Sequence, residues 1–240
     1  MNPANGRSAS RADVFCFPFA GGGASYYRAW APKAPASITL RPVQLPGREE
    51  RMGEAPFDRM PRLVEALADG LARDLDRSYA LFGHSMGALV CYELAQELRR
   101  RGERLPAHLF VSGAPAPHLA PLVVPIYDLP GERFYAEIRR FGGLPDEVWR
   151  SEELLALLMP RFRADLAVTG TYAYTERPPL DCPITAFGGE EDETVSLASI
   201  EGWREHTVKA FRRELFPGGH FFLNEFGPRI LAVIGDELSS

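Results

Sequence analysis

Residues 83–87, which read Gly-His-Ser-Met-Gly, constrain the fold of this chain more than any other segment. The apolar run 79–82 precedes them, and residues 88–101 follow with helical spacing. A strand that delivers a serine into a sharp turn before a helix is the setting of a nucleophile elbow. The strained backbone of such a turn requires small residues two positions to either side of the serine. This context, more than the five letters alone, predicts that Ser85 is a nucleophile.

A reactive serine needs a base that takes its proton. His220 stands in a glycine-containing loop after the strand-like run 213–216, where its side chain can project over a sheet edge, and it is the predicted base. His84 lies inside the turn, so we expect it to pack or to form hydrogen bonds locally. The remaining histidines lack such a setting and are expected to be surface or core residues: His108, His118 and His206.

The acid that orients the base is expected between the serine and the histidine in chain order. Residues 183–189 read as a buried strand, and four consecutive acidic residues, 190–193, follow it. Asp192 is the predicted acid because it stands just past the strand end, where its side chain can turn toward the imidazole. Glu191 is the reserve candidate, and the two outer glutamates are expected to form a solvated turn.

Acyl transfer at a serine also needs N–H donors for the developing oxyanion. Met86 supplies one by its position directly after the serine. Residues 13–18 read as an early strand, and the small-residue loop 19–25 follows it, so the amide of Ala20 is the predicted second donor. The loop lacks the glycine spacing of phosphate-binding motifs, which argues against nucleotide binding.

Strand-like and helical runs alternate along the chain, which favours an α/β fold with a mostly parallel sheet and crossover helices. The runs outside the turn are a second strand at 38–43, a helix at 61–75 and a strand at 109–113. Residues 114–179 interrupt the alternation with two amphipathic stretches, 132–141 and 151–167. The interruption falls between the serine turn and the acidic loop, where α/β-hydrolases insert a helical lid.

Apolar residues on the two amphipathic stretches exceed what two short helices need to pack on each other. About half of them are expected to cover the core alone. We expect the others to line an acyl chamber over Ser85, reached by a slender arm. The candidates are Phe134, Ile138, Leu158, Met159 and Phe162.

Composition limits the other possibilities. A chain of 240 residues with 45% hydrophobic content can bury one core, so we expect a single domain over 13–240 after a disordered tail, 1–12. The net charge of -5 argues against nucleic-acid binding. No stretch reads as a signal peptide or a membrane span, and the three cysteines show no metal-ligand spacing, which indicates a reduced cytoplasmic protein. Nothing in the sequence suggests an obligate dimer, so a monomer is expected.

Together these segments resemble the type II, or editing, thioesterases that accompany polyketide synthases and nonribosomal peptide synthetases. The resemblance spans residues 14–238, including the methionine of the serine turn. It is carried by residues 17–25, 44–48 with Arg51, 83–87, 144–145, 160–165, 178–184, 188–189 and 218–223. The acidic loop departs from the family's common Asp-Asp-Pro, because this chain has Glu191-Asp192-Glu193. Alignment through Gly188-Gly189 and Val195 puts the family's aspartate at Asp192.

The resemblance implies an α/β-hydrolase that unloads acyl groups from the phosphopantetheine arm of acyl or peptidyl carrier proteins. It implies a Ser-His-Asp mechanism with Ser85, His220 and Asp192, and no metal or cofactor of the enzyme's own. Two alternatives remain open at this stage. One is a general serine carboxylesterase, which shares the same motifs. The other is a catalytically silent hydrolase fold that docks on a megasynthase.

Overall fold

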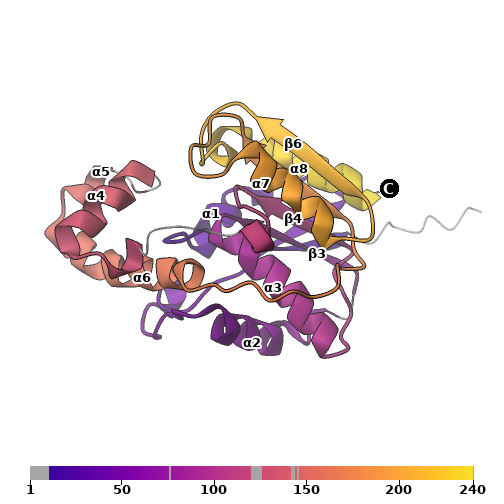
Figure 1. Cartoon of the computed structure of the whole chain (residues 1–240), viewed down its shortest axis with the longest axis horizontal. Coiled ribbons are helices and arrows are strands. Elements are labelled where there is room, and N and C mark those ends of the chain that lie inside the picture. Colours follow the sequence, from indigo (N-terminus) through magenta and orange to yellow (C-terminus); the bar gives the residue numbers. More distant parts are fainter. Residues whose placement is uncertain (1–10, 76, 120–125, 142–143, 145, 240) are drawn as a thin grey trace, which may run out of the picture.

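Six parallel strands form the central sheet of the protein. The computed structural model describes residues 11–75, 77–119, 126–141, 144 and 146–239 (Figure 1). The strand order is β2-β1-β3-β4-β5-β6, and each of these neighbouring pairs is parallel. The strands are β1 (Ala12–Phe17), β2 (Ile38–Pro42), β3 (Tyr79–His84), β4 (His108–Ser112), β5 (Ile184–Gly189) and β6 (Phe211–Phe216). The prediction of an α/β fold with a mostly parallel sheet is confirmed.

Helices cover both faces of this sheet (Figure 1). The α-helices are α1 (Ala24–Arg28), α2 (Met60–Leu71), α3 (Met86–Arg100), α4 (Gly131–Phe141), α5 (Asp146–Trp149), α6 (Glu152–Gly170), α7 (Leu197–Glu201) and α8 (Leu223–Ser239). Short 3₁₀ turns lie at Ala31–Lys33, Glu49–Arg51, Pro117–Leu119, Ile126–Asp128 and Gly202–His206. In Figure 1, α2 and α3 lie below the sheet and α8 lies above it.

The strands are apolar on both sides because both faces are covered. Successive side chains of a strand point to opposite faces. In β1, Phe15 and Phe17 pack with residues of α2 and α3, whereas Val14 and Cys16 pack with residues of α1 and α8. The three cysteines are free and buried, so they pack as small apolar residues: Cys16, Cys91 and Cys182.

Strand pairing decides which loops meet at the carboxyl edge of the sheet. β1 pairs with β3 so that Phe17 lies opposite Gly83, which brings the loop after β1 next to the serine turn. β5 pairs with β6 so that Gly189 lies opposite Phe216, which brings the acidic loop next to the loop of His220. From β1 the chain continues to β2 on one side and then crosses to β3 on the other side. In open α/β sheets, ligand sites form where the connections change direction in this way.

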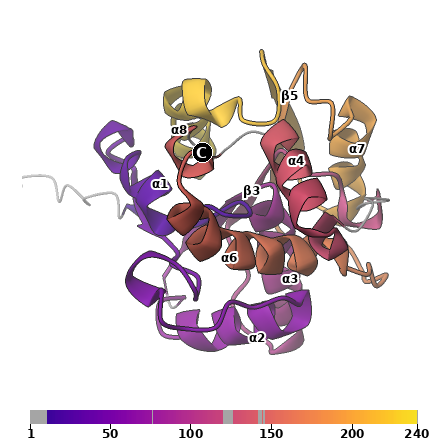
Figure 2. The same ribbon diagram turned by 90° about the vertical axis from the view of Figure 1, so that its left-hand side faces the viewer.

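The lid lies between β4 and β5 in the chain and consists of α4, α5 and α6. Helices α4 and α5 stand beyond one end of the sheet, and α6 runs back toward α3 (Figures 1 and 2). A separate apolar cluster holds these helices together: Ile126, Phe134, Ile138, Met159 and Phe162. The two amphipathic stretches are therefore helices as expected. The first begins one residue earlier than predicted, at Gly131, and the second spans Glu152–Gly170.

Several helix and strand boundaries differ from those predicted from the sequence. Strand β1 begins at Ala12, inside the segment expected to be a tail, and residues 1–10 of that tail lie outside the described residues. The helix expected over 61–75 spans Met60–Leu71, because Leu75 packs into the core from the connection that follows. Among the described residues, no helix has the length and apolar character needed to cross a bilayer.

Candidate active site

Ser85 occupies a strained position at the carboxyl end of β3. Its backbone has φ 55° and ψ −118°, a left-handed region that residues other than glycine rarely adopt. The Ser85 N–H donates to the carbonyl of Ser112 at 2.7 Å, which anchors the turn to β4. Backbone strain of this kind persists where the surroundings hold it, and it clusters at active sites. The turn aims the serine side chain into a cavity above the sheet edge.

The two glycines of the turn are required by close backbone contacts. A Cβ at Gly83 would lie 2.1 Å from the carbonyl oxygen of Gly87, inside the first turn of α3. A Cβ at Gly87 would lie 2.3 Å from the carbonyl oxygen of Phe17 at the end of β1. Both contacts involve backbone atoms, which cannot rotate away as a side chain could. The tight turn, and with it the placement of Ser85, therefore depends on both glycines.

His220 and Asp192 form a close pair at the ends of β6 and β5. His220 Nδ1 lies 2.7 Å from Asp192 Oδ2, and the Asp192 side chain is 1% exposed. The other carboxylate oxygen, Oδ1, accepts from the N–H and hydroxyl of Thr194 at 2.8 and 2.6 Å and from the Val195 N–H at 3.2 Å. The carboxylate is therefore held in one orientation, facing the imidazole.

The charge state of this pair suits a base. Burial acts to raise the pKa of Asp192, but hydrogen bonds from His220 and Thr194 and the charge of His220 outweigh it, so the pKa is lowered. An ionised Asp192 accepts a hydrogen bond from His220 Nδ1–H, and this leaves Nε2 with its lone pair. Glu191, the reserve candidate, has an exposed side chain, and its backbone N–H donates to the Gly218 carbonyl.

His84 is buried behind the turn, where it packs against neighbouring rings. Its Nδ1 lies 2.9 Å from Ser112 Oγ, and its ring is 5.0 Å from that of His220. Burial and the nearby His220 keep the pKa of His84 well below its usual value, so the ring stays neutral. The other three histidines lie outside the cavity wall, as expected: His108, His118 and His206.

The two residues predicted to supply oxyanion amides line the same cavity as Ser85. Met86 is the first residue of α3, where an N–H has no partner within the helix and the helix dipole favours negative charge. Ala20 lies in the loop after β1, and its N–H donates to no acceptor in the described part of the chain. Both predicted oxyanion donors thus line the space in front of the serine.

Ser85 and His220 face this cavity together. Within the described residues, Ser85 Oγ makes no hydrogen bond, to His220 or to any other group. Such contacts are often long in a free enzyme and tighten when substrate binds. Ser85 and His220 therefore share one cavity wall without a preformed hydrogen bond between them.

The cavity has a volume of about 160 Å³ and a mostly apolar wall. Of the five predicted chamber residues, the structure brings Phe162 alone to this wall. The other four pack within the lid, in contact with its apolar cluster: Phe134, Ile138, Leu158 and Met159. These four side chains point into the apolar cluster between the lid helices. They therefore form the core of the lid and do not line the cavity.

Sequence reasoning missed several residues of the wall: Ile126, Tyr127, Leu166, Thr169 and Gly170. Leu166 follows Phe162 by one helical turn, and that spacing was the one available signal. Ile126 and Tyr127 belong to an irregular connection, which has no periodicity from which a facing direction could be deduced.

The arrangement can support acyl transfer. A serine at a strained apex, a histidine held by an ionised aspartate and two amides facing one apolar cavity match the requirements for attack on a carbonyl carbon.

Comparisons with known proteins agree on one family. The model described as "Thioesterase domain" matches residues 12–238. The gramicidin S biosynthesis protein GrsT of Aneurinibacillus migulanus is 42% identical over 222 residues, which cover 92% of this chain and 87% of that protein. RedJ, a thioesterase from the prodiginine pathway of Streptomyces coelicolor, has a TM-score of 0.89 at 43% identity and covers 95% of this chain and 91% of its own. The type II thioesterase BorB of the borrelidin cluster has a TM-score of 0.87 at 35% identity, with 95% and 93% covered.

Proposed function

The chain belongs to the thioesterase family, and from this membership we propose that it hydrolyses thioesters on the phosphopantetheine arm of acyl or peptidyl carrier proteins. The similar proteins carry names tied to gramicidin S, prodiginine and borrelidin biosynthesis, which supports a role beside a peptide or polyketide synthase. Hydrolysis there removes stalled or misprimed acyl groups, so the synthase can resume chain extension.

One observation carries this proposal: His220, paired with Asp192 at 2.7 Å, shares a cavity with Ser85. In the first step, Ser85 Oγ attacks the thioester carbonyl while His220 Nε2 accepts the hydroxyl proton. Asp192 holds the imidazole in position and stabilises the imidazolium. The carbonyl oxygen gains negative charge, which the amides of Ala20 and Met86 stabilise by donating hydrogen bonds.

Collapse of this intermediate breaks the carbon–sulfur bond and releases the phosphopantetheine thiol. A thiol has a pKa near 8.5, so the sulfur leaves readily as a thiolate. It then takes the proton from the His220 imidazolium, which returns His220 to its neutral form. The acyl group then remains on Ser85 as an ester. Neutral His220 next takes a proton from water as the water oxygen attacks that ester. When the second intermediate collapses, the bond from the carbonyl carbon to Ser85 Oγ breaks, His220 returns the proton to Oγ, and the free acid departs.

The size of the cavity supports short acyl groups as substrates. Sites for drug-sized ligands commonly measure about 300–1,000 Å³. The cavity over Ser85 has about half the lower of these volumes, 160 Å³. Its wall includes Tyr127, whose ring lies where a Cβ on Gly170 would fall, 2.6 Å from the ring carbons. Tyr127 and Gly170 thus pack closely in this part of the wall.

A panel of carrier proteins loaded with acyl groups of increasing length tests the proposal. Wild type should release short acyl groups rapidly, and Ser85→Ala should release almost none, because the nucleophile is lost. Mass spectrometry of the carrier measures the loss of each acyl group.

Matched oxoesters of the same acyl groups serve as the control. A thioesterase should prefer the carrier-bound thioester clearly. Equal rates on oxoester and thioester, with no advantage from the carrier, would indicate a general carboxylesterase. Failure of a fluorophosphonate to label Ser85 in wild type would indicate that the site is catalytically silent.

A further inference from the structure

Two segments that the reaction itself does not use, residues 44–48 and 160–165, meet beside the loop that follows β1. The guanidinium of Arg48 and the carboxylate of Asp165 form a two-pronged ion pair, with Nη1–Oδ2 at 2.8 Å and Nη2–Oδ1 at 2.6 Å. These residues are 117 positions apart, and their side chains are 9% and 3% exposed. The pair joins the connection after β2 to the lid helix α6, away from the reacting groups.

The same two side chains hold the loop of Ala20. Asp165 Oδ2 accepts from the Gly21 N–H at 2.8 Å, and Arg48 Nη1 donates to the Gly22 carbonyl at 3.0 Å. The Gly21 N–H belongs to the peptide unit that directly follows the Ala20 Cα. Gly21 has φ +79°, a conformation that other residues rarely adopt. The ion pair therefore fixes the backbone one peptide unit away from the Ala20 amide.

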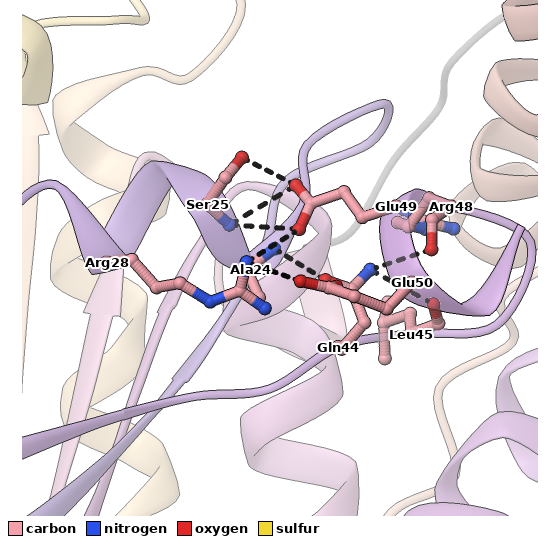
Figure 3. Close-up of polar contacts among 8 residues, drawn as sticks. All are labelled: Ala24, Ser25, Arg28, Gln44, Leu45, Arg48, Glu49 and Glu50. Atoms are coloured by element: carbon pink, nitrogen blue, oxygen red, sulfur yellow. Dashed lines mark hydrogen bonds and ion pairs between the residues drawn. The ribbon is translucent and has the colours of Figure 1, made fainter.

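Other side chains hold the outer part of this loop. Gln44 Oε1 accepts from the Ala24 N–H at 3.2 Å, and the Glu49 carboxylate accepts from the N–H and hydroxyl of Ser25 at 3.2 and 2.6 Å (Figure 3). Arg28 approaches the same carboxylate at 3.4 Å. These outer contacts are largely exposed, whereas the Arg48–Asp165 pair is buried. The buried pair therefore controls the inner part of the loop, nearest to Ser85.

Helix α6 contacts the inner loop in a second way. A Cβ at Gly21 would lie 2.2 Å from Phe162 Cε2, so the Phe162 ring packs directly on the Gly21 backbone. Phe162 and Asp165 are one turn apart and therefore share one face of α6. Phe162 also forms part of the cavity wall. Movement of α6 would consequently disturb the loop and the cavity together.

We propose that Arg48 and Asp165 are positioning residues that aim the Ala20 amide at the oxyanion and make this donor dependent on the docked position of α6. This inference rests on the proposed function, because it takes Ala20 as an oxyanion donor. Neither side chain touches the substrate. Their effect reaches the reaction through the Gly21 and Gly22 peptide units, so it should appear in the rate of acyl transfer rather than in substrate affinity.

A double variant, Arg48→Met with Asp165→Leu, separates positioning from stability. Replacement of a whole buried ion pair by apolar residues of similar size is often neutral or stabilising, so the protein should stay folded. The loop then loses the acceptor for Gly21 N–H and the donor for Gly22 carbonyl. Loss of one oxyanion donor typically lowers kcat by about 10²–10³-fold, and kcat should fall on the order of 100-fold here with KM little changed.

The decisive readout is the rate at which a fluorophosphonate labels Ser85, since its phosphoryl oxygen enters the oxyanion site without any carrier. Labelling should slow in parallel with kcat. A folded double variant that labels and turns over at wild-type rates would overturn the proposal. If the double variant does not fold, Arg48→Lys decides in the same assay. The ammonium keeps the charge opposite Asp165, but it cannot form both contacts to the carboxylate and also reach the Gly22 carbonyl, so labelling should be slower than in wild type. Labelling of folded Arg48→Lys at the wild-type rate would overturn the proposal.

The pair of Glu93 and Arg177 provides a matched control. Arg177 Nη2 lies 2.6 and 2.7 Å from the two Glu93 oxygens, and neither residue lines the cavity of Ser85. Glu93→Gln with Arg177→Met should leave the labelling rate unchanged. If the proposed function is wrong, the result is different: the fluorophosphonate still labels Ser85 of wild type at a normal rate, but wild type does not hydrolyse carrier thioesters. The labelling comparison still decides the positioning role in that case.

Discussion

Asp192 Oδ2 lies 2.7 Å from His220 Nδ1, although 28 positions separate the two residues in the chain. They meet because β5 and β6 are parallel neighbours, with Gly189 opposite Phe216, so the loops after both strands leave the sheet at the same edge. The carboxylate is buried, and three donors from Thr194 and Val195 bind its Oδ1 atom. Its Oδ2 atom therefore faces the imidazole.

Asp192→Asn should lower kcat by about 10⁴-fold, because an amide in this place favours the wrong imidazole tautomer. Steady-state hydrolysis of an acyl thioester measures the loss. Glu191→Gln is the matched control: its side chain is exposed, its backbone contact to Gly218 remains, and activity should stay at the wild-type level. A large loss in Glu191→Gln with little in Asp192→Asn would move the acid role to the reserve residue.

Gly87→Ala should destabilise the protein and impair the site together. The new Cβ would lie 2.3 Å from the Phe17 carbonyl oxygen and 2.9 Å from that of Pro18, where β1 leads into the loop of Ala20. Overpacking of this kind costs about 1–3 kcal/mol, which urea unfolding measures. Gly70→Ala is the control, because Gly70 lies within α2 and, apart from the backbone of its own helix and its chain neighbours, no heavy atom is within 4 Å of its Cβ position. That variant should gain up to about 1 kcal/mol. Equal stability of the two variants would contradict the steric account.

Phe162→Ala should shift acyl preference toward longer chains, whereas Met159→Ala should not. Phe162 lines the cavity, and Met159 packs in the lid cluster without reaching it. The measurement is the ratio of kcat/KM for a long acyl thioester to that for a short one. This ratio cancels any common loss that arises where Phe162 supports Gly21. An unchanged ratio in Phe162→Ala, or an equal shift in both variants, would show that the cavity does not select the acyl group.

The unfolding free energy should fall as the pH drops, in part through His108. Burial lowers the pKa of His108 to about 4; the charge of Glu237 acts to raise this pKa, and the charge of Arg212 acts to lower it further. An unfolded histidine binds a proton below about pH 6.5, while the folded one stays neutral until about pH 4. The unfolded state therefore gains protons first, and stability falls by roughly 1 kcal/mol per pH unit across that window.

His108→Gln removes this contribution, and urea unfolding across the same window measures it. The variant can keep a hydrogen bond to Thr185, which lies 2.8 Å from His108 Nε2. Its stability should depend less steeply on pH than that of wild type, whatever its absolute stability. Parallel curves for the two proteins would show that His108 titrates normally in the folded state.

Local constraints made the serine turn and the sheet predictable from the chain alone. Between a strand and a helix, the sequence Gly-His-Ser-Met-Gly is compatible with few backbone conformations. Ser85 adopts a strained one, with φ 55°. Buried parallel strands read as continuous apolar runs, so β3, β4 and β5 were recognisable within a residue or two. Asp192 and His220 were accessible to the same reasoning, because each follows directly on a strand end.

Side-chain directions in the lid were not predictable in this way. Phe134, Ile138, Leu158, Met159 and Phe162 are all apolar and lie on helices, yet the packing of α4 against α6 determines which of them face the cavity. Periodicity identifies an apolar face, but it does not identify the surface against which that face packs.

The amino-acid order thus specifies the elements and their reactive residues, since those depend on neighbours within a few positions. The contacts between residues far apart in the chain are decided by the tertiary structure. Arg48 and Asp165 become partners once α6 docks on the loop of Ala20, across 117 positions of chain. Such a pair depends on the close approach of distant backbones, and no local propensity encodes that distance.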